Sequence, residues 1–198
     1  LGLSLEDVKV RLSSDGKGRM ELDSRFHSGG GHLSLTGLLE DFGSDQWQLE
    51  AAMDGENFQV VDQTQIKARV SPAIRLKASA QETRLTGEAL IPYAQVDIKT
   101  LPASATQVSD DVVIEEEAHK SASAAQQNRF FMNVTAVLGD EVRLNGFGLT
   151  SRLSGRMQVI KTPERALLTT GYVGVAEGTY KAYGQELTIS RGQLVFQG

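Results

Sequence analysis

Apolar and polar side chains alternate along most of the chain. Between Lys17 and Phe26 the odd positions are charged, whereas the even positions include Met20, Leu22 and Phe26. Successive side chains of a β-strand point to opposite faces, whereas an amphipathic helix needs apolar residues three and four apart. The alternation therefore predicts strands, and it continues through residues 66–70, 74–79 and 147–159.

Turn-forming residues separate these runs at short intervals. The predicted turns are Ser14-Asp15-Gly16, Gly29-Gly30-Gly31, Asp54-Gly55, Gly139-Asp140, Thr162-Pro163 and Arg191-Gly192. Outside residues 101–128 no segment has the pattern of an amphipathic helix, so strands do not alternate with helices as in a parallel α/β sheet. We predict an all-β fold, built as a predominantly antiparallel meander.

A short motif of leucine, a small polar residue and glycine recurs without a fixed period. It occurs at Leu35-Thr36-Gly37, Leu85-Thr86-Gly87, Leu144-Asn145-Gly146 and Leu153-Ser154-Gly155. The motif predicts the end of a strand, with the leucine pointing inward and the glycine at positive φ or in close backbone contact. Common hairpin chemistry and true repetition both account for it.

Residues 101–128 differ in composition from the rest of the chain, because serine, alanine, glutamine and acidic residues replace the alternation. We predict three parts: an N-terminal β part (1–100), an acidic flexible loop or linker (101–128) and a C-terminal β part (129–198). A solvated loop or short helix is the simplest interpretation of the middle part, and a lid or partner-binding arm is the functional alternative.

Composition narrows the class of protein. With 198 residues, of which 40% are hydrophobic, the chain can build a core, and its net charge of −5 is mixed along the sequence. This balance disfavours a nucleic-acid surface, which needs a basic stripe. Apolar runs such as Val112-Val113-Ile114 are too short to cross a bilayer as a helix. Residues 1–10 lack the features of a signal peptide, so we expect any export signal or membrane anchor outside this stretch.

Candidate catalytic groups are sparse. There is no cysteine, and His27, His32 and His119 fall in predicted turns or loops, with the first two five residues apart. That spacing matches neither a strand nor a helical metal site. The glycines at 29–31 lack the rest of a phosphate-binding loop, and no serine lies in a nucleophile elbow. We therefore predict a protein without enzymatic activity, and we expect no cofactor and no metal.

The C-terminal third contains a long ordered string, G-x-Y-x-A-Y-G-Q-x-L-x-I-x-R-G-x-L-x-F-x-G, from Gly178 to Gly198. This string, together with 144–149 and Ser154-Gly155 upstream, resembles the conserved C-terminal region of the TamB family. Members of that family are periplasmic subunits of the translocation and assembly module. From Leu1 to Leu101 the chain shares only the general style of the family, which is alternating β repeats that end in glycine.

The resemblance implies an open, taco-like sheet with an apolar interior groove whose long edges are not sealed together. It also implies a full-length protein anchored in the inner membrane and extending across the periplasm of a Gram-negative bacterium, with this stretch near the outer membrane. Family members look like bridges for phospholipid, and they partner the outer-membrane barrel protein TamA, which aids autotransporter insertion.

A one-sided apolar sheet of this kind suits phospholipid or detergent acyl chains, which slide without directional contacts. We expect the groove to be lined by Met20, Leu22, Phe26, Leu33, Leu35, Ile74, Leu76, Phe147, Leu149, Leu153, Met157, Val159, Leu187 and Ile189. The alternative for each of them is ordinary packing in a sandwich or closed barrel. The alternative function is β-augmentation docking, or a chaperone role, for TamA without lipid conduction.

Overall fold

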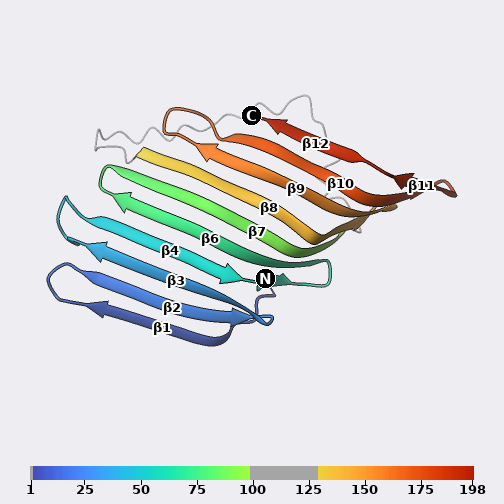
Figure 1. The fold of residues 1–198 in the computed structure, drawn as a ribbon. Helices are drawn as coiled ribbons and strands as arrows, with labels where there is room; N and C mark the ends of the chain where they lie inside the picture. The colour runs from blue at the N-terminus through green and yellow to red at the C-terminus, as the bar shows by residue number, and fades with distance from the viewer. Residues whose placement is uncertain (1, 99–128) are drawn as a thin grey trace, which may run out of the picture.

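The computed structural model describes residues 2–98 and 129–198, which form one twelve-stranded sheet (Figure 1). Its strands are β1 (Glu6–Ser14), β2 (Met20–Ser28), β3 (Gly31–Glu40), β4 (Gln48–Glu56), β5 (Phe58–Asp62), β6 (Ile66–Ser79), β7 (Glu82–Ile98), β8 (Arg129–Gly146), β9 (Leu149–Lys161), β10 (Leu168–Ala182), β11 (Gln185–Ile189) and β12 (Gly192–Gln197). The predicted all-β fold is confirmed. The predicted linker, 101–128, lies outside the described residues.

The sheet is open, with β1 at one edge and β11 and β12 at the other. The order of strands is β1-β2-β3-β4-β6-β7-β8-β9-β10-β11. Two short strands complete it by sharing a long neighbour: β5 pairs with β6 beside β4, and β12 pairs with β10 beside β11. Most neighbours are antiparallel and follow one another along the chain, as the sequence predicted.

The strands β7 and β8 depart from the meander because they run parallel. Their register extends from Glu82, which pairs with Arg129, to Ile98, which pairs with Gly146. Parallel strands cannot be joined by a short hairpin, which sets this pair apart from its antiparallel neighbours. The N-terminal and C-terminal β parts therefore meet inside a single continuous sheet.

Bulges in neighbouring strands bend the middle of the sheet. The register shifts where Val70 of β6 lies opposite an extra residue of β7 near Pro92, and again between Leu138 and Val142 in β8. These positions lie side by side, because Arg69 pairs with Tyr93 and Tyr93 pairs with Glu141. An extra residue in one strand kinks it and increases its twist. Gly139-Asp140, predicted as a turn, belongs to the bulge of β8.

Asp54-Gly55 is the second predicted turn that is wrong. Both residues lie inside β4, where they pair with Ser34 and Leu33. Asp54 is held there by an ion pair across the sheet, with its Oδ1 3.0 Å from Arg75 Nη2. Gly55 lies so close to β3 that an added Cβ would be 2.8 Å from the carbonyl oxygen of His32. Cross-strand partners thus override the local turn preference of this dipeptide.

The recurring glycine motif marks close approaches between strands more often than strand ends. Of its four glycines, only Gly146 ends a strand. Gly87 lies within β7 at φ +139°, and a Cβ there would collide with the carbonyl oxygen of Ala73. Gly155 lies within β9, where a Cβ would collide with the carbonyl oxygen of Tyr172. Glycine at these two positions lets the backbones approach where a side chain has no room.

Candidate functional site

The register of the sheet sorts side chains onto two faces, because paired residues on adjacent strands point to the same side. We call the side that carries Leu22, Leu76 and Met157 the apolar face, and the other side the polar face. One row across the apolar face consists of Leu12, Leu22, Gly37, Ala51, Leu76, Leu85 and Met132. A second row consists of Leu35, Met53, Ile74, Gly87, Val134 and Val159.

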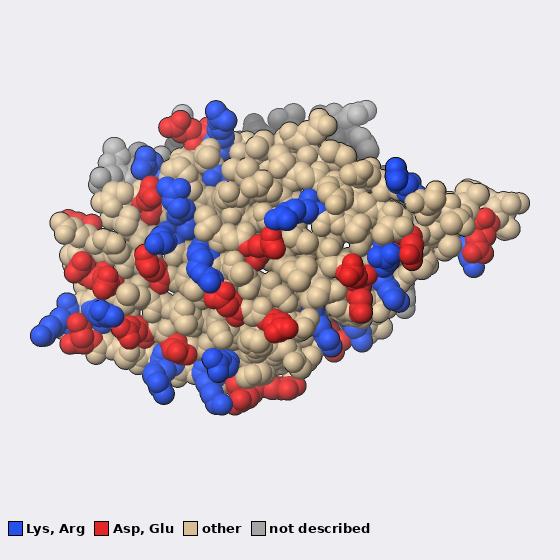
Figure 2. Space-filling model, in the orientation of Figure 1, with Lys and Arg blue, Asp and Glu red and all other residues tan. Residues whose placement is uncertain are grey.

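Charged residues are almost excluded from the apolar face. Among the paired residues of 2–98 and 129–198, Lys161 at the end of β9 is the one charged side chain on this side, and it pairs with Met132. The polar face carries the rest, in cross-strand pairs such as Lys77 with Glu50 (2.7 Å) and Arg156 with Glu88 (2.7 Å). Figure 2 shows basic and acidic side chains interspersed over the sheet. The molecule is therefore amphipathic across its thickness.

The structure places thirteen of the fourteen predicted groove residues on the apolar face. These are Met20, Leu22, Phe26, Leu33, Leu35, Ile74, Leu76, Leu149, Leu153, Met157, Val159, Leu187 and Ile189. Phe147 lies apart, in the turn between β8 and β9, where its φ is +52°. The residues of β2 and β9 are six strand spacings apart, or about 29 Å along the sheet.

Solvent reaches much of the apolar face. Among the described residues only Phe58, Ala94 and Val142 are buried hydrophobic side chains. Central residues such as Leu22, Leu76 and Met157 are half-buried. Exposure rises toward both edges, to 64% at Leu12 in β1 and 68% at Leu194 in β12. A sandwich or closed core would bury these side chains, so the described strands do not seal this face against themselves.

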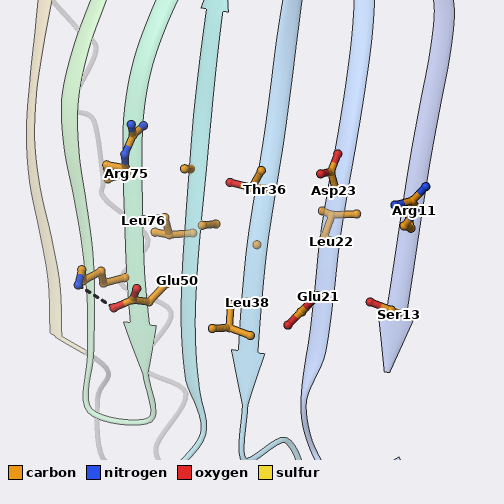
Figure 3. A pocket seen from close by; sticks show the side chains of 14 residues that line it. Arg11, Ser13, Glu21, Leu22, Asp23, Thr36, Leu38, Glu50, Arg75 and Leu76 are labelled. Carbon is orange, nitrogen blue, oxygen red and sulfur yellow. Dashed lines mark hydrogen bonds and ion pairs between the residues drawn. The ribbon is translucent and has the colours of Figure 1, made fainter. Parts of the chain in front are cut away.

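The polar face has a shallow hollow of about 580 Å³ over β1 to β4 and β6. Arg11, Glu21, Asp23, Glu50 and Arg75 point into or rim this hollow (Figure 3). Its charged groups are of both signs and lie largely exposed, so it lacks the buried, convergent groups of a catalytic pocket.

The two N-terminal histidines lie in strands and not in turns, which corrects the prediction for them. His27 in β2 pairs directly with His32 in β3, and their ring centroids are 6.4 Å apart. Nδ1 of His27 is 3.8 Å from Oδ2 of Asp7. Within the part of the chain that the structure describes, no group of three or more histidine, aspartate or glutamate side chains is arranged to hold a metal ion. His119 lies outside that part.

Comparison with known proteins decides the family. Residues 19–198 match the family model described as TamB C-terminal domain. The chain is also 31% identical, over 202 aligned positions that cover 97% of it, to the translocation and assembly module subunit TamB of Haemophilus influenzae. The chain belongs to the TamB family.

The match to the TamB family covers β2 through β12 and leaves out β1. The chain spans about 15% of the length of the Haemophilus TamB relative. That relative is named as a subunit of a translocation and assembly module. The described residues contain no helix that is long and apolar enough to cross a membrane.

The sequence pattern missed the centre of the TamB-family apolar face, in β7 and β8. Within β7 the residues on the apolar face have odd numbers as far as Ile91, as at Leu85 and Ala89. From Ala94 onward, as at Val96, they have even numbers. The bulge at Pro92 causes this change of phase, because one extra residue turns the following side chains over. A proline inside an alternating run is the signal that could have located the change.

Proposed function

We propose that this TamB-family chain binds the acyl chains of phospholipids on its apolar face and has no enzymatic activity. It belongs, in this proposal, to a periplasm-spanning protein that is anchored in the inner membrane of a Gram-negative bacterium. That protein carries phospholipid between the inner and outer membranes and supports outer-membrane protein and autotransporter assembly together with TamA. The near absence of charge on one whole face of an open sheet supports this proposal.

The dimensions of the sheet suit an acyl chain. The hydrocarbon core of a bilayer is about 30 Å thick, so one acyl chain extends over about 15 Å. The 13 residues of β9 cover about 43 Å at roughly 3.3 Å per residue. Several lipid tails can therefore lie along one strand, and Leu, Val and Met side chains offer them no directional contacts that would halt sliding.

The energetics also favour lipid on this face. Each methylene group of an acyl chain that leaves water contributes about 0.8 kcal/mol to binding. The half-buried leucines and valines of the sheet add to this, because the acyl chain removes more of their surface from water. The headgroup stays in water, beside an open edge or end of the sheet. Large exposed apolar patches on soluble proteins mark interaction sites, and this patch crosses ten strands.

The test places a charge in the middle of the apolar face. Leu153 pairs with Val142 on one side and Val175 on the other. We expect Leu153→Asp to reduce co-purifying phospholipid, measured by extraction and mass spectrometry, by about tenfold or more, because an acyl chain cannot solvate a carboxylate. Met157→Arg should act in the same way. Circular dichroism checks that the sheet persists.

The matched control is Ser154→Asp, one residue along β9. Ser154 pairs with Gly174 on the polar face, so the same charge there meets water. Lipid content should stay as in the parent chain. A folded Leu153→Asp variant with unchanged bound lipid contradicts lipid carriage on this face.

The unpaired edges of the sheet favour a second candidate function, which is docking by β-augmentation. All nine residues of β1 are exposed, and its outer edge has no partner among the described strands. Such an edge can add a strand from another protein, for which TamA is the candidate. Native mass spectrometry distinguishes the two functions. Bound phospholipid on the purified chain supports lipid carriage, whereas tight binding to TamA by a lipid-free chain supports docking.

A further inference from the structure

Two tight turns at the same end of the sheet expose aromatic rings. Phe147-Gly148 joins β8 to β9 with φ values of +52° and +84°, and Tyr183-Gly184 joins β10 to β11 with +51° and +75°. The closing pairs are Gly146 with Leu149 and Ala182 with Gln185, so each loop has two residues. Positive φ at both positions defines a type I′ turn.

An aromatic residue is a costly choice at the first position of such a turn. That position favours Asn, Asp or Gly, because a bulky side chain is strained at positive φ. The turn between β2 and β3 has the same form and uses Gly29 and Gly30, with φ of +59° and +81°. Packing does not compensate for the strain at the aromatic turns, because Phe147 is 52% exposed and Tyr183 is fully exposed. Strain that folding does not explain points to function.

The first turn is tied to the hairpin that carries the second. Lys181 N–H donates a hydrogen bond to the Gly148 carbonyl oxygen (2.8 Å), which ties the second hairpin to the first turn. Beyond that bond the tip of β10 and β11 continues past the neighbouring strands, as Figures 1 and 2 show. We call Phe147, Tyr180, Tyr183 and Leu187 the aromatic tip.

Two residues of the aromatic tip, Tyr180 and Leu187, continue the apolar face. Tyr180 pairs with Leu187 on one side and with Leu149 on the other, all three on that face. The charged residues of the same hairpin, Lys181 and Glu186, pair with each other on the polar face, with Nζ 3.1 Å from Oε2. The hairpin is therefore electrically balanced, apolar on one side and capped by a tyrosine.

These features together fit the boundary between lipid headgroups and hydrocarbon. Tyrosine and other aromatic rings concentrate at that boundary, where the ring is in hydrocarbon and the hydroxyl is in water. We propose that the aromatic tip inserts into the surface of a lipid bilayer, at the end of the apolar face where lipids enter or leave. The last clause rests on the proposed function, whereas insertion itself is measured without it.

The test replaces both strained aromatics with the residue that the turns prefer. We expect the chain carrying Phe147→Asn and Tyr183→Asn to keep its fold with an equal or higher Tm. Its binding to vesicles of phosphatidylethanolamine with a minority of phosphatidylglycerol should fall at least about tenfold, because two aromatic rings no longer move from water into the bilayer on binding.

Phe42→Asn is the matched control, since Phe42 is 66% exposed in the turn between β3 and β4 at the opposite end of the sheet. That variant should bind vesicles as the parent does.

Tryptophan fluorescence gives a second readout. The single tryptophan, Trp47, lies at the same far end as Phe42, just before β4. Its emission should not shift when vesicles are added, whereas the tryptophan introduced by Tyr183→Trp in a Trp47→Phe background should shift to shorter wavelength. Unchanged vesicle binding by the folded double-asparagine variant overturns the proposal, and so does an unshifted emission from the introduced tryptophan.

The outcomes separate this proposal from lipid carriage. If the double-asparagine variant loses vesicle binding while Leu153→Asp keeps its bound lipid, the tip binds membranes and carriage on the apolar face fails. If Leu153→Asp loses lipid while the double-asparagine variant still binds vesicles, carriage stands and the tip proposal fails. Loss of TamA binding by the double-asparagine variant, with vesicle binding intact, identifies the tip as a protein contact and overturns the lipid assignment.

Discussion

At the scale of single residues, Asp15 shows how one carboxylate organises a turn. Its Oδ1 accepts hydrogen bonds from the backbone N–H groups of Lys17 (2.7 Å) and Arg19 (3.0 Å) between β1 and β2. These two hydrogen bonds are the main reason that the pKa of Asp15 is lowered from its ordinary value. A carboxyl group whose pKa is lower in the folded state contributes stability above its unfolded pKa, and that contribution is lost as pH falls through the folded pKa.

We predict that acid loosens this turn selectively. Below about pH 3.9, the ordinary pKa of aspartate, the contribution of Asp15 should begin to fall, and it should vanish once pH is below the folded pKa. The protection factors of the Lys17 and Arg19 amide hydrogens, which correct exchange for its intrinsic dependence on pH, should fall over this window. Asp15→Asn keeps an acceptor oxygen without a titratable group, so its exchange should lack the acid step. An Asp15 carboxyl that titrates by NMR at or above about 3.9 contradicts the prediction.

Single residues also show where the alternation and the turn preferences stop predicting the structure. Leu149 and Val159 alternate correctly from the apolar face of β9, and Phe147 continues the same odd numbering. The chain leaves the strand geometry at the turn, so Phe147 has no register position on the apolar face although its number fits. The wrong turn prediction at Asp54-Gly55 has the opposite cause, since its ion pair with Arg75 comes from a strand 21 residues away. Local propensity does not contain such a partner.

At the scale of elements, alternation identified strands well but not their direction. A strand with one apolar face has the same period whether its neighbour is parallel or antiparallel. The alternation therefore could not show that β7 and β8 are parallel, although the predicted turns at 14–16, 29–31 and 162–163 do join antiparallel neighbours. The bulges were equally hidden, because they show only as a change of phase.

The edge strand β1 leads to a prediction about self-association. Val10 and Leu12 lie on the apolar face and are 61% and 64% exposed, beside an outer edge that is unpaired among the described strands. Apolar edges pair with other chains, and charges that point inward on an edge strand prevent this pairing. We expect Val10→Lys with Leu12→Lys to lower the dimer and oligomer fraction in sedimentation velocity by several-fold.

A lysine on the other side of the same strand is the control. Ser13 pairs with Glu21 on the polar face, so Ser13→Lys adds charge without changing the apolar side of the edge. Its oligomer distribution should match that of the parent chain. Equal self-association in the double-lysine variant and the parent means that copies of the chain meet through another surface.

At the scale of the whole molecule, the openness of the sheet is the property that alternation cannot predict. The same one-sided strands would build a sandwich if a second layer covered them. The burial pattern distinguishes an open sheet from a sandwich. The described residues bury only three hydrophobic side chains, although apolar residues occupy one face of every long strand. The TamB resemblance anticipated an open sheet on other grounds, and the structure agrees with it.

An open sheet should leave a calorimetric signature. The heat capacity increment of unfolding follows the apolar area newly exposed to water, at about 12–15 cal/mol/K per residue in globular proteins. A globular chain of 198 residues would give about 2.4–3.0 kcal/mol/K. We expect a clearly smaller heat capacity increment for the lipid-free chain in scanning calorimetry, because much of its apolar face is already in contact with water.

Binding of phospholipid or detergent tails should raise both the heat capacity increment and Tm, since a ligand at about 100 times its Kd stabilises the folded state by about 2.7 kcal/mol. Leu153→Asp should lose this dependence on added tails while Ser154→Asp keeps it. A lipid-free chain with the full globular increment would mean that its apolar face is covered in solution, by another copy or by the sheet folding onto itself.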